Sequence, residues 1–152
     1  MLYVAALLLG VTAGLRAITP LAALAWGAWL GWINLSGTWA AFAGNIVVVV
    51  ILTILAVGEL VTDQLPNTPS RKVPQQFVAR IVTGGVSGLV LGLPSGNWLA
   101  CLVLGVVGAV IGTLGGYEAR RALAASFGRD LPAGLLEDVV AIVIAFGAVY
   151  FA

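Results

Sequence analysis

Long apolar stretches separated by short polar breaks are the feature that most limits how this chain folds. The longest reads NIVVVVILTILAV and covers residues 45–57. A helix that crosses a membrane needs about 20 predominantly apolar residues, and about 17 is the lower end of the range. Applied along the chain, this rule predicts six helices, at residues 2–15, 17–33, 42–64, 77–93, 98–114 and 133–151. The conformation of residues 117–127 is left ambiguous.

The scarcity of charge supports a membrane location. Charged residues make up 9% of the 152 residues and hydrophobic residues 61%, whereas soluble domains carry about 25% charged residues. We therefore expect an all-α integral membrane protein: one domain over residues 1–152, folded as a compact bundle of about six transmembrane helices, some short or broken. Its expected partner is the lipid bilayer. Seven basic residues are too few for a surface that binds nucleic acid.

The basic and aromatic residues agree on an orientation. When the six segments cross alternately, all the basic residues fall on one side: Arg16, Arg71, Lys72, Arg80, Arg120, Arg121 and Arg129. The positive-inside rule makes this side cytoplasmic. The five tryptophans, Tyr150 and Phe151 fall near the opposite ends of the segments, as expected of an interfacial aromatic belt. The predicted topology places both termini outside the cytoplasm.

Glycines recur at a spacing of four residues in three segments. They are Gly10 and Gly14, then Gly84, Gly88 and Gly92, and finally Gly108, Gly112 and Gly116. Small residues at this spacing let helix backbones approach closely in lipid. We expect these positions to form helix–helix contacts, and such faces are also compatible with a homodimer.

Residues 9–24 and 111–126 align without a gap when the chain is shifted by 102 positions. Six small or apolar residues coincide, and Arg16 falls opposite Glu118. The pattern suggests an internal repeat, of the kind whose interface holds the binding site in many transporters. In the predicted topology the two copies are parallel. An inverted pair would require residues 17–33 or 77–93 to be re-entrant.

Two carboxylates end the third apolar segment. Glu59 and Asp63 are four residues apart and so share one helix face. They lie in the last turn, where the helix dipole disfavours anions. We therefore expect an arginine beside them, either Arg16 or Arg80. The alternative is that both carboxylates mark the point at which the helix reaches water.

Glu137 and Asp138 lie in the first turns of the last predicted helix, where the dipole favours carboxylates. Asp130 is a candidate N-cap for that helix, with Pro132 in its opening turn. Stabilisation of the helix is one explanation of the pair. The other is that Glu137, embedded in LLEDVVAIV, is buried, because an ionisable residue inside a membrane bundle usually belongs to a pathway or relay.

Arginines mark two further positions. Arg16 lies between Gly14 and Pro20 at a predicted break between helices, where it either forms an anion site with freed backbone groups or simply flanks the membrane. Glu118, Arg120 and Arg121 lie on a short amphipathic piece that reads as an interfacial helix. Its basic residues are suited to contact anionic lipid headgroups.

The chain lacks the residues that several classes of enzyme and transporter need. The chain has no histidine and a single cysteine, Cys101, inside an apolar run, which removes the usual zinc ligands and the usual general base. It contains no Walker A loop and no GxSxG motif. We therefore expect no cofactor, no catalytic residues and no ATP-driven transport by this chain alone, and we leave a metal site open.

The segments AGLRAITP, GELVTDQLPNTPSR with VARIVTGG, and LLEDVVAI resemble a family of small bacterial inner-membrane proteins known as domain of unknown function forty-one twenty-six. The similarity runs over nearly the whole chain. Its most specific element is E-x-x-x-D-x-x-P-x-x-x-S-R, and the matching residues are Gly58, Glu59, Asp63, Pro66, Ser70, Arg71 and Arg80. Family members often have lysine where this chain has Gln64. If that lysine neutralises Glu59 and Asp63 in the family, then in this chain either Arg16 or Arg80 must supply the missing positive charge, or the acidic pair holds a proton.

The resemblance implies a compact helical protein of the bacterial inner membrane and no settled activity, so three hypotheses remain. The leading one is a small secondary transporter or flippase-like carrier, in which an arginine holds an anionic substrate and Glu59 or Asp63 carries a coupling proton or sodium ion. Its candidate site residues are Arg16, Glu59, Asp63, Arg80, Glu118, Arg120, Glu137 and Asp138. The second is an accessory or structural membrane protein with a cytoplasmic docking surface. The third and weakest is an enzyme that acts on lipid headgroups through carboxylates and Mg²⁺ or Ca²⁺.

Overall fold

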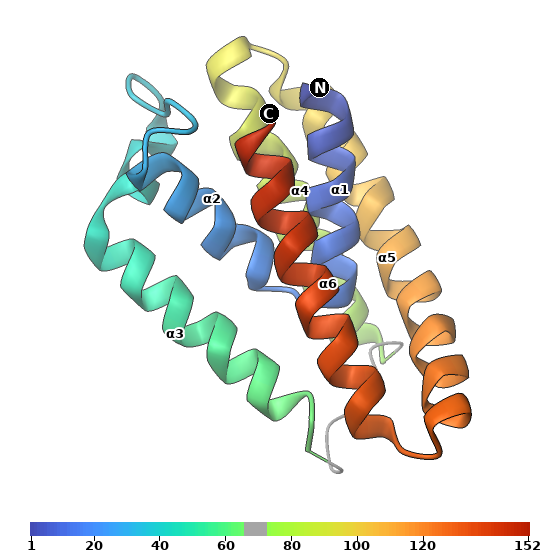
Figure 1. Cartoon of the computed structure of the whole chain (residues 1–152). Helices are drawn as coiled ribbons and strands as arrows, with labels where there is room; N and C mark the ends of the chain where they lie inside the picture. Colours follow the sequence, from blue (N-terminus) through green and yellow to red (C-terminus); the bar gives the residue numbers. More distant parts are fainter. Residues whose placement is uncertain (66–72) are drawn as a thin grey trace.

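The computed structural model describes residues 1–65 and 73–152, and within these ranges the protein is helical with no strand. Its α-helices are α1 (Leu2–Leu15), α2 (Thr19–Trp29), α3 (Ile46–Thr62), α4 (Pro74–Gly92), α5 (Trp98–Phe127) and α6 (Asp130–Tyr150). Two 3-10 helices, η1 (Trp39–Gly44) and η2 (Leu93–Ser95), lie in the connections. Both termini lie at the same end of the molecule (Figure 1). The predicted all-α class is confirmed.

Three helical segments are long and apolar enough to cross a membrane: Pro74–Ser95, Trp98–Phe127 and Asp130–Tyr150. They have 22, 30 and 21 residues, and at about 1.5 Å per residue each reaches the bilayer's hydrocarbon thickness of about 30 Å. These segments indicate a membrane protein. By contrast, α1 has 14 residues, α3 has 17 and α2 has 11. The prediction of one long helix over residues 17–33 is therefore wrong.

The short α2 is bounded by local backbone features. Before it, Arg16 has an extended backbone (φ −142°, ψ 117°) that ends α1. Pro20 lies in the first turn of α2, where a missing N–H costs nothing. After it, Gly31 has a φ of +79°, a left-handed conformation that glycine adopts readily at the end of a helix. The break between α1 and α2 therefore lies at residues 16–18.

Three other boundaries differ from the prediction. Residues 117–127 continue α5 without interruption, because they are rich in alanine, arginine and other strong helix formers and contain no proline. The last helix begins at Asp130 with Arg129 as its N-cap, so the assignment of Asp130 as the cap is wrong. The predicted segment 42–64 begins within η1, and α3 itself starts behind Asn45, whose side chain accepts a hydrogen bond from the N–H of Val47.

Glycines join α1, α4 and α5 through close backbone contacts, as predicted. A Cβ added to Gly10 would lie 2.2 Å from the carbonyl oxygen of Gly105, and one added to Gly88 would lie 2.0 Å from that of Cys101. No side chain fits at such distances, so these helix backbones touch. Helix α1 lies at the centre of the bundle and contacts α4, α5 and α6, whereas α3 lies at one side against α2 and η1 (Figure 1).

The two segments of the suggested repeat have different conformations. Residues 9–24 contain the end of α1, the break and the first part of α2, whereas residues 111–126 lie wholly inside α5. Arg16 is therefore extended, and Glu118, its counterpart in the alignment, is helical.

Large aromatic side chains gather toward the end of the bundle that holds the termini. The residues belong to the end of α2, the connection to α3, the start of α5 and the end of α6, and Figure 1 shows these segments at the end of the bundle where the chain termini lie. The exposed ones in these segments are Trp29, Trp32, Trp39, Phe42, Trp98, Tyr150 and Phe151. Their position is the one expected of an interfacial belt.

Candidate functional site

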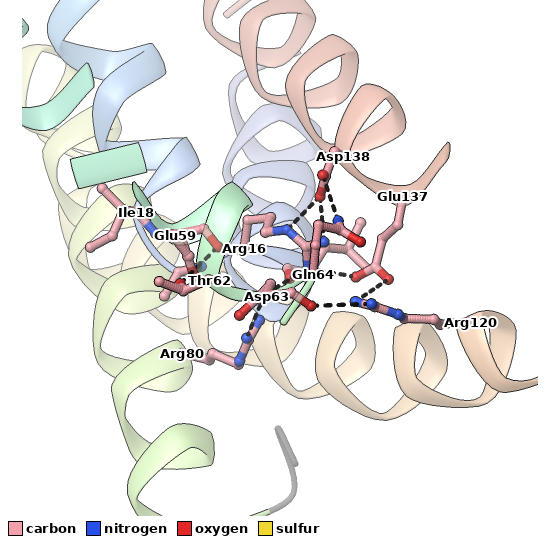
Figure 2. A network of polar contacts seen from close by, with 12 residues as sticks. Arg16, Ile18, Glu59, Thr62, Asp63, Gln64, Arg80, Arg120, Glu137 and Asp138 are labelled. Carbon is pink, nitrogen blue, oxygen red and sulfur yellow. Dashed lines mark hydrogen bonds and ion pairs between the residues drawn. The ribbon is translucent and has the colours of Figure 1, made fainter. Parts of the chain in front are cut away.

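Polar side chains converge at the break between α1 and α2 (Figure 2). Because α1 ends after 14 residues, its last residue lies part of the way along the longer helices α5 and α6 (Figure 1). Arg16 follows at this point, and its exposure is 0%. A buried guanidinium group is costly unless opposite charges and hydrogen bonds compensate it.

Arg16 binds carboxylates that come from two other helices. Its Nε donates to Asp138 Oδ1 at 2.7 Å, and its Nη1 lies 2.9 Å from Asp63 Oδ2 and 3.2 Å from Glu137 Oε1. Nη2 also pairs with Asp138, and Nη1 donates to the carbonyl oxygen of Leu15 at 2.8 Å. Arg16 therefore joins the end of α1 to the end of α3 and to α6.

Two further arginines contact the same group of carboxylates. Arg80 of α4 is 3% exposed, donates to the carbonyl oxygen of Gly14 at 2.8 Å and lies 3.7 Å from Asp63 Oδ2. Arg120 of α5 donates to the carbonyl oxygen of Asp63 at 3.2 Å and lies 3.8 Å from Glu137 Oε2. Asp63 thus meets all three arginines. The prediction that Asp63 lies beside Arg16 or Arg80 is confirmed, because both arginines are close to its carboxylate.

Glu59 lies one turn before Asp63, but its own partners differ from those expected. Its Oε1 accepts a hydrogen bond from the N–H of Ala17 at 2.7 Å, and its Oε2 accepts one from the N–H of Ile18 at 2.8 Å. These N–H groups lie in the break immediately before α2, beside the positive end of its helix dipole. The unfavourable position of Glu59 at the end of α3 is therefore offset by the beginning of α2 and not by direct contact with a guanidinium.

Glu137 and Asp138 are buried, with exposures of 9% and 8%. Since α6 begins at Asp130, they lie in its third turn, whereas the effect of the dipole is confined to the first. Stabilisation of the helix terminus therefore does not explain them. Arg16 and Arg120 compensate their charge instead.

Gln64 and Gly134 also shape this site, although neither was predicted as a site residue. The Nε2 of Gln64 donates to Asp138 Oδ2 at 2.9 Å. A Cβ on Gly134 would lie 2.3 Å from Gln64 Oε1 and 2.9 Å from Arg120 Nη2, so a larger residue requires these side chains to shift. The sequence did offer one indication of the role of Gly134. A glycine inside a helical pattern destabilises the helix, so its presence suggests that packing requires a small residue there.

Replacing Gly134 with alanine is expected to displace Gln64 from Asp138. The lost hydrogen bond to a charged group, partly offset by alanine's better helix propensity, should lower the free energy of unfolding by about 1 kcal/mol. Titration with a denaturing detergent measures this change. Gly147→Ala is the matched control on α6, because a Cβ there meets nothing within 4 Å. Gln64→Ala should suppress the effect of Gly134→Ala, and an unchanged effect would contradict the assigned contact.

Of the predicted site residues, Glu118 does not join the others. It pairs with Arg121 at 3.2 Å on the surface of α5, where the two side chains are 53% and 73% exposed. The remaining seven converge and are called the Arg16 cluster below: Arg16, Glu59, Asp63, Arg80, Arg120, Glu137 and Asp138. Pro66, Ser70, Arg71 and Lys72 lie outside the described residues.

Among the described residues, the Arg16 cluster contains four carboxylates and three guanidinium groups, and Arg120 also pairs with Asp130 at 2.7 Å. Within residues 1–65 and 73–152, no group of three or more Cys, Asp or Glu side chains is placed to hold a metal ion.

No family model, no curated protein and no solved structure matches the chain.

Proposed function

We propose that this protein is a small secondary carrier or flippase-like transporter and that the Arg16 cluster is its binding site. The observation that carries the proposal is the meeting of seven charged residues from five helices at a helix break inside an apolar bundle. Ionisable groups in such a place are costly and usually serve a substrate or ion pathway. Secondary transporters commonly build their sites at broken helices.

The contacts suggest how a proton and an anionic substrate are coupled. Arg16 and Arg80 both face Asp63 Oδ2, so an anionic group of the substrate has to replace a carboxylate. Protonation of Asp63 would remove its negative charge, so that the anion could take its place beside Arg80 and Arg16 while Arg16 keeps its contacts with Glu137 and Asp138. A sodium ion bound to Asp63 would act in the same way. Movement of the anion is thereby linked to the coupling ion.

We further propose that all six helical segments cross, or partly cross, a bacterial inner membrane, as the resemblance in the sequence implies. The short helices α1 and α2 would then act as discontinuous segments surrounded by longer ones. Arg121 and Arg129 lie near the end of α5 that is opposite the termini (Figure 1), which the positive-inside rule makes cytoplasmic. The proposal requires neither a common origin of residues 9–24 and 111–126 nor a homodimer.

The alternative functions have less support. A cytoplasmic docking surface would have to use exposed charges such as Glu118 and Arg121, because Arg16, Arg80 and Asp138 of the cluster are 0%, 3% and 8% exposed. A metal-assisted enzyme that acts on lipid headgroups gains no support from the carboxylates of the described residues, which form no ligand group of three or more.

Asp63→Asn is expected to reduce proton-coupled flux by about tenfold or more, equivalent to about 1.4 kcal/mol, because asparagine cannot take up the coupling proton. The measurement uses liposomes that contain the purified protein and a trapped pH-sensitive dye, with candidate anions supplied outside. Glu118→Gln is the control, since this carboxylate is exposed and outside the cluster. Flux that is confirmed for the wild type but unchanged in both Asp63→Asn and Glu59→Gln would show that the site is wrongly assigned.

A further inference from the structure

Helix α3 is attached to the rest of the bundle less closely than the other helices. Of its 17 residues, Val49 and Ala56 are the buried ones. Apolar side chains along its length are about half exposed or more, among them Val47, Ile51 and Ile54. Its main contacts are with α2 and η1 and not with the central helix α1.

The glycine contacts that join the core are missing from α3. Its single glycine, Gly58, would have nothing within 4 Å of an added Cβ. In lipid, apolar surface provides no driving force for helices to associate, so close packing and polar contacts hold them together. Since α3 has little close packing, its position depends on its polar contacts.

Those polar contacts are concentrated where α3 ends. They include the hydrogen bonds that Glu59 accepts from the N–H groups just before α2, the ion pairs of Asp63 with Arg16 and Arg80, the hydrogen bond from Arg120 to the Asp63 carbonyl oxygen, and the hydrogen bond of Gln64 with Asp138 (Figure 2). Nearer the beginning of α3, Thr53 accepts a hydrogen bond from the indole N–H of Trp26 at 2.9 Å. The first half of α3 therefore stays joined to α2, while its last turn is held by charges.

We propose that α3 is the gate of the Arg16 cluster: its C-terminal end is latched by Glu59 and Asp63 and swings away when one of these carboxylates loses its charge. This inference rests on the proposed carrier function and describes how access to that same site is controlled. The opening would face the flank on which the apolar side chains of α3 are exposed, so the cluster opens sideways.

The charges around the latch explain its sensitivity. Arg16 after α1, Arg80 of α4 and Arg120 of α5 face the end of α3 and attract it. Glu137 of α6 competes for Arg16 and Arg120, and Asp138 competes for Arg16. When Asp63 is neutral, these two carboxylates keep Arg16, and the end of α3 loses its ion pairs. When Glu59 is neutral, the N–H groups just before α2 lose a charged acceptor.

The test uses two pairs of spin labels in a Cys101→Ser background, in protein reconstituted in lipid nanodiscs. The gate pair joins Val57 of α3 to Val139 of α6, and the control pair joins Val82 of α4 to Val107 of α5; all four side chains are exposed. Pulsed electron paramagnetic resonance distances are compared between the parent protein, Asp63→Asn and Glu59→Gln. We expect both variants to add a longer-distance population to the gate pair and to leave the control pair unchanged.

The outcomes separate the gate from the carrier function. An unchanged gate-pair distance in both variants would overturn the gate, and it would leave the carrier function intact if Asp63→Asn still loses flux. Lengthening of both pairs would also overturn the gate, because the cluster would then hold the whole bundle together. A longer gate-pair distance in a protein without any measurable flux would overturn the carrier function and retain the charge-controlled movement of α3.

Discussion

Replacing Arg16 with methionine should lower the free energy of unfolding by about 3–5 kcal/mol, because removal of one partner leaves buried carboxylates without their counter-ion. Methionine fills part of the same space, but it offers nothing to Asp63, Glu137 and Asp138, which all bind the guanidinium group. Titration of the purified protein with a denaturing detergent measures the change. Arg16→Lys should have an intermediate effect, since an ammonium group cannot reproduce the planar fork of donors.

Arg121→Met is the matched control for this experiment. It makes the same chemical change on a side chain that is 73% exposed and pairs with an exposed glutamate. A surface position of this kind should change stability by no more than about 0.5 kcal/mol. Adding Asp138→Asn to Arg16→Met should restore part of the lost stability, because the two residues are coupled. Equal losses from Arg16→Met and Arg121→Met would contradict the assigned role of Arg16.

Gly112→Ala should destabilise the bundle by about 1–3 kcal/mol, as expected of overpacking in a close-packed contact. The added Cβ would lie 2.1 Å from the carbonyl oxygen of Val11 and 2.8 Å from its carbonyl carbon. Both are backbone atoms, so relief requires α1 and α5 to move apart. The melting temperature in detergent micelles is the measurement, and it should fall.

Gly115→Ala provides the control on the same helix. A Cβ there has nothing within 4 Å, so the better helix propensity of alanine should raise stability by about 0.5–1 kcal/mol. The two variants add the same methyl group to α5, three residues apart, and are expected to differ in sign. If both raise the melting temperature, α1 and α5 do not touch at Gly112.

Features that depend on local pattern were predicted well from the sequence. The six helical segments and the glycine contacts follow from hydrophobicity, helix propensity and residue size. Two helix boundaries were predicted wrongly. The helix expected over residues 17–33 is shorter because the extended backbone of Arg16 and the position of Pro20 delay its start. Helix α5 is longer because residues 117–127 contain nothing that breaks a helix.

The candidate site was predicted in part. The dipole at the end of α3 required a positive group near Glu59 and Asp63, and Asp63 has Arg16 and Arg80 beside it. The partners of Glu59 were not predictable, because every residue except proline carries an N–H group and only the packing of α3 brings those of Ala17 and Ile18 to Glu59. The position of Glu118 outside the cluster was not predictable either. Which face of α5 turns toward the other helices depends on how α5 packs, and Glu118 lies on the exposed face.

By itself, the sequence determined that this protein is helical, belongs in a membrane, and has helices that approach closely at glycines, because apolar length, scarcity of charge and small residues act locally. The tertiary structure decided which of its few charges are buried together. A charge inside an apolar bundle is stable only beside an opposite charge or a hydrogen-bonding partner, and those partners come from helices far apart in the chain. Whether two carboxylates at the end of an apolar helix meet water or arginine is therefore settled by the packing of α1, α4, α5 and α6 around them.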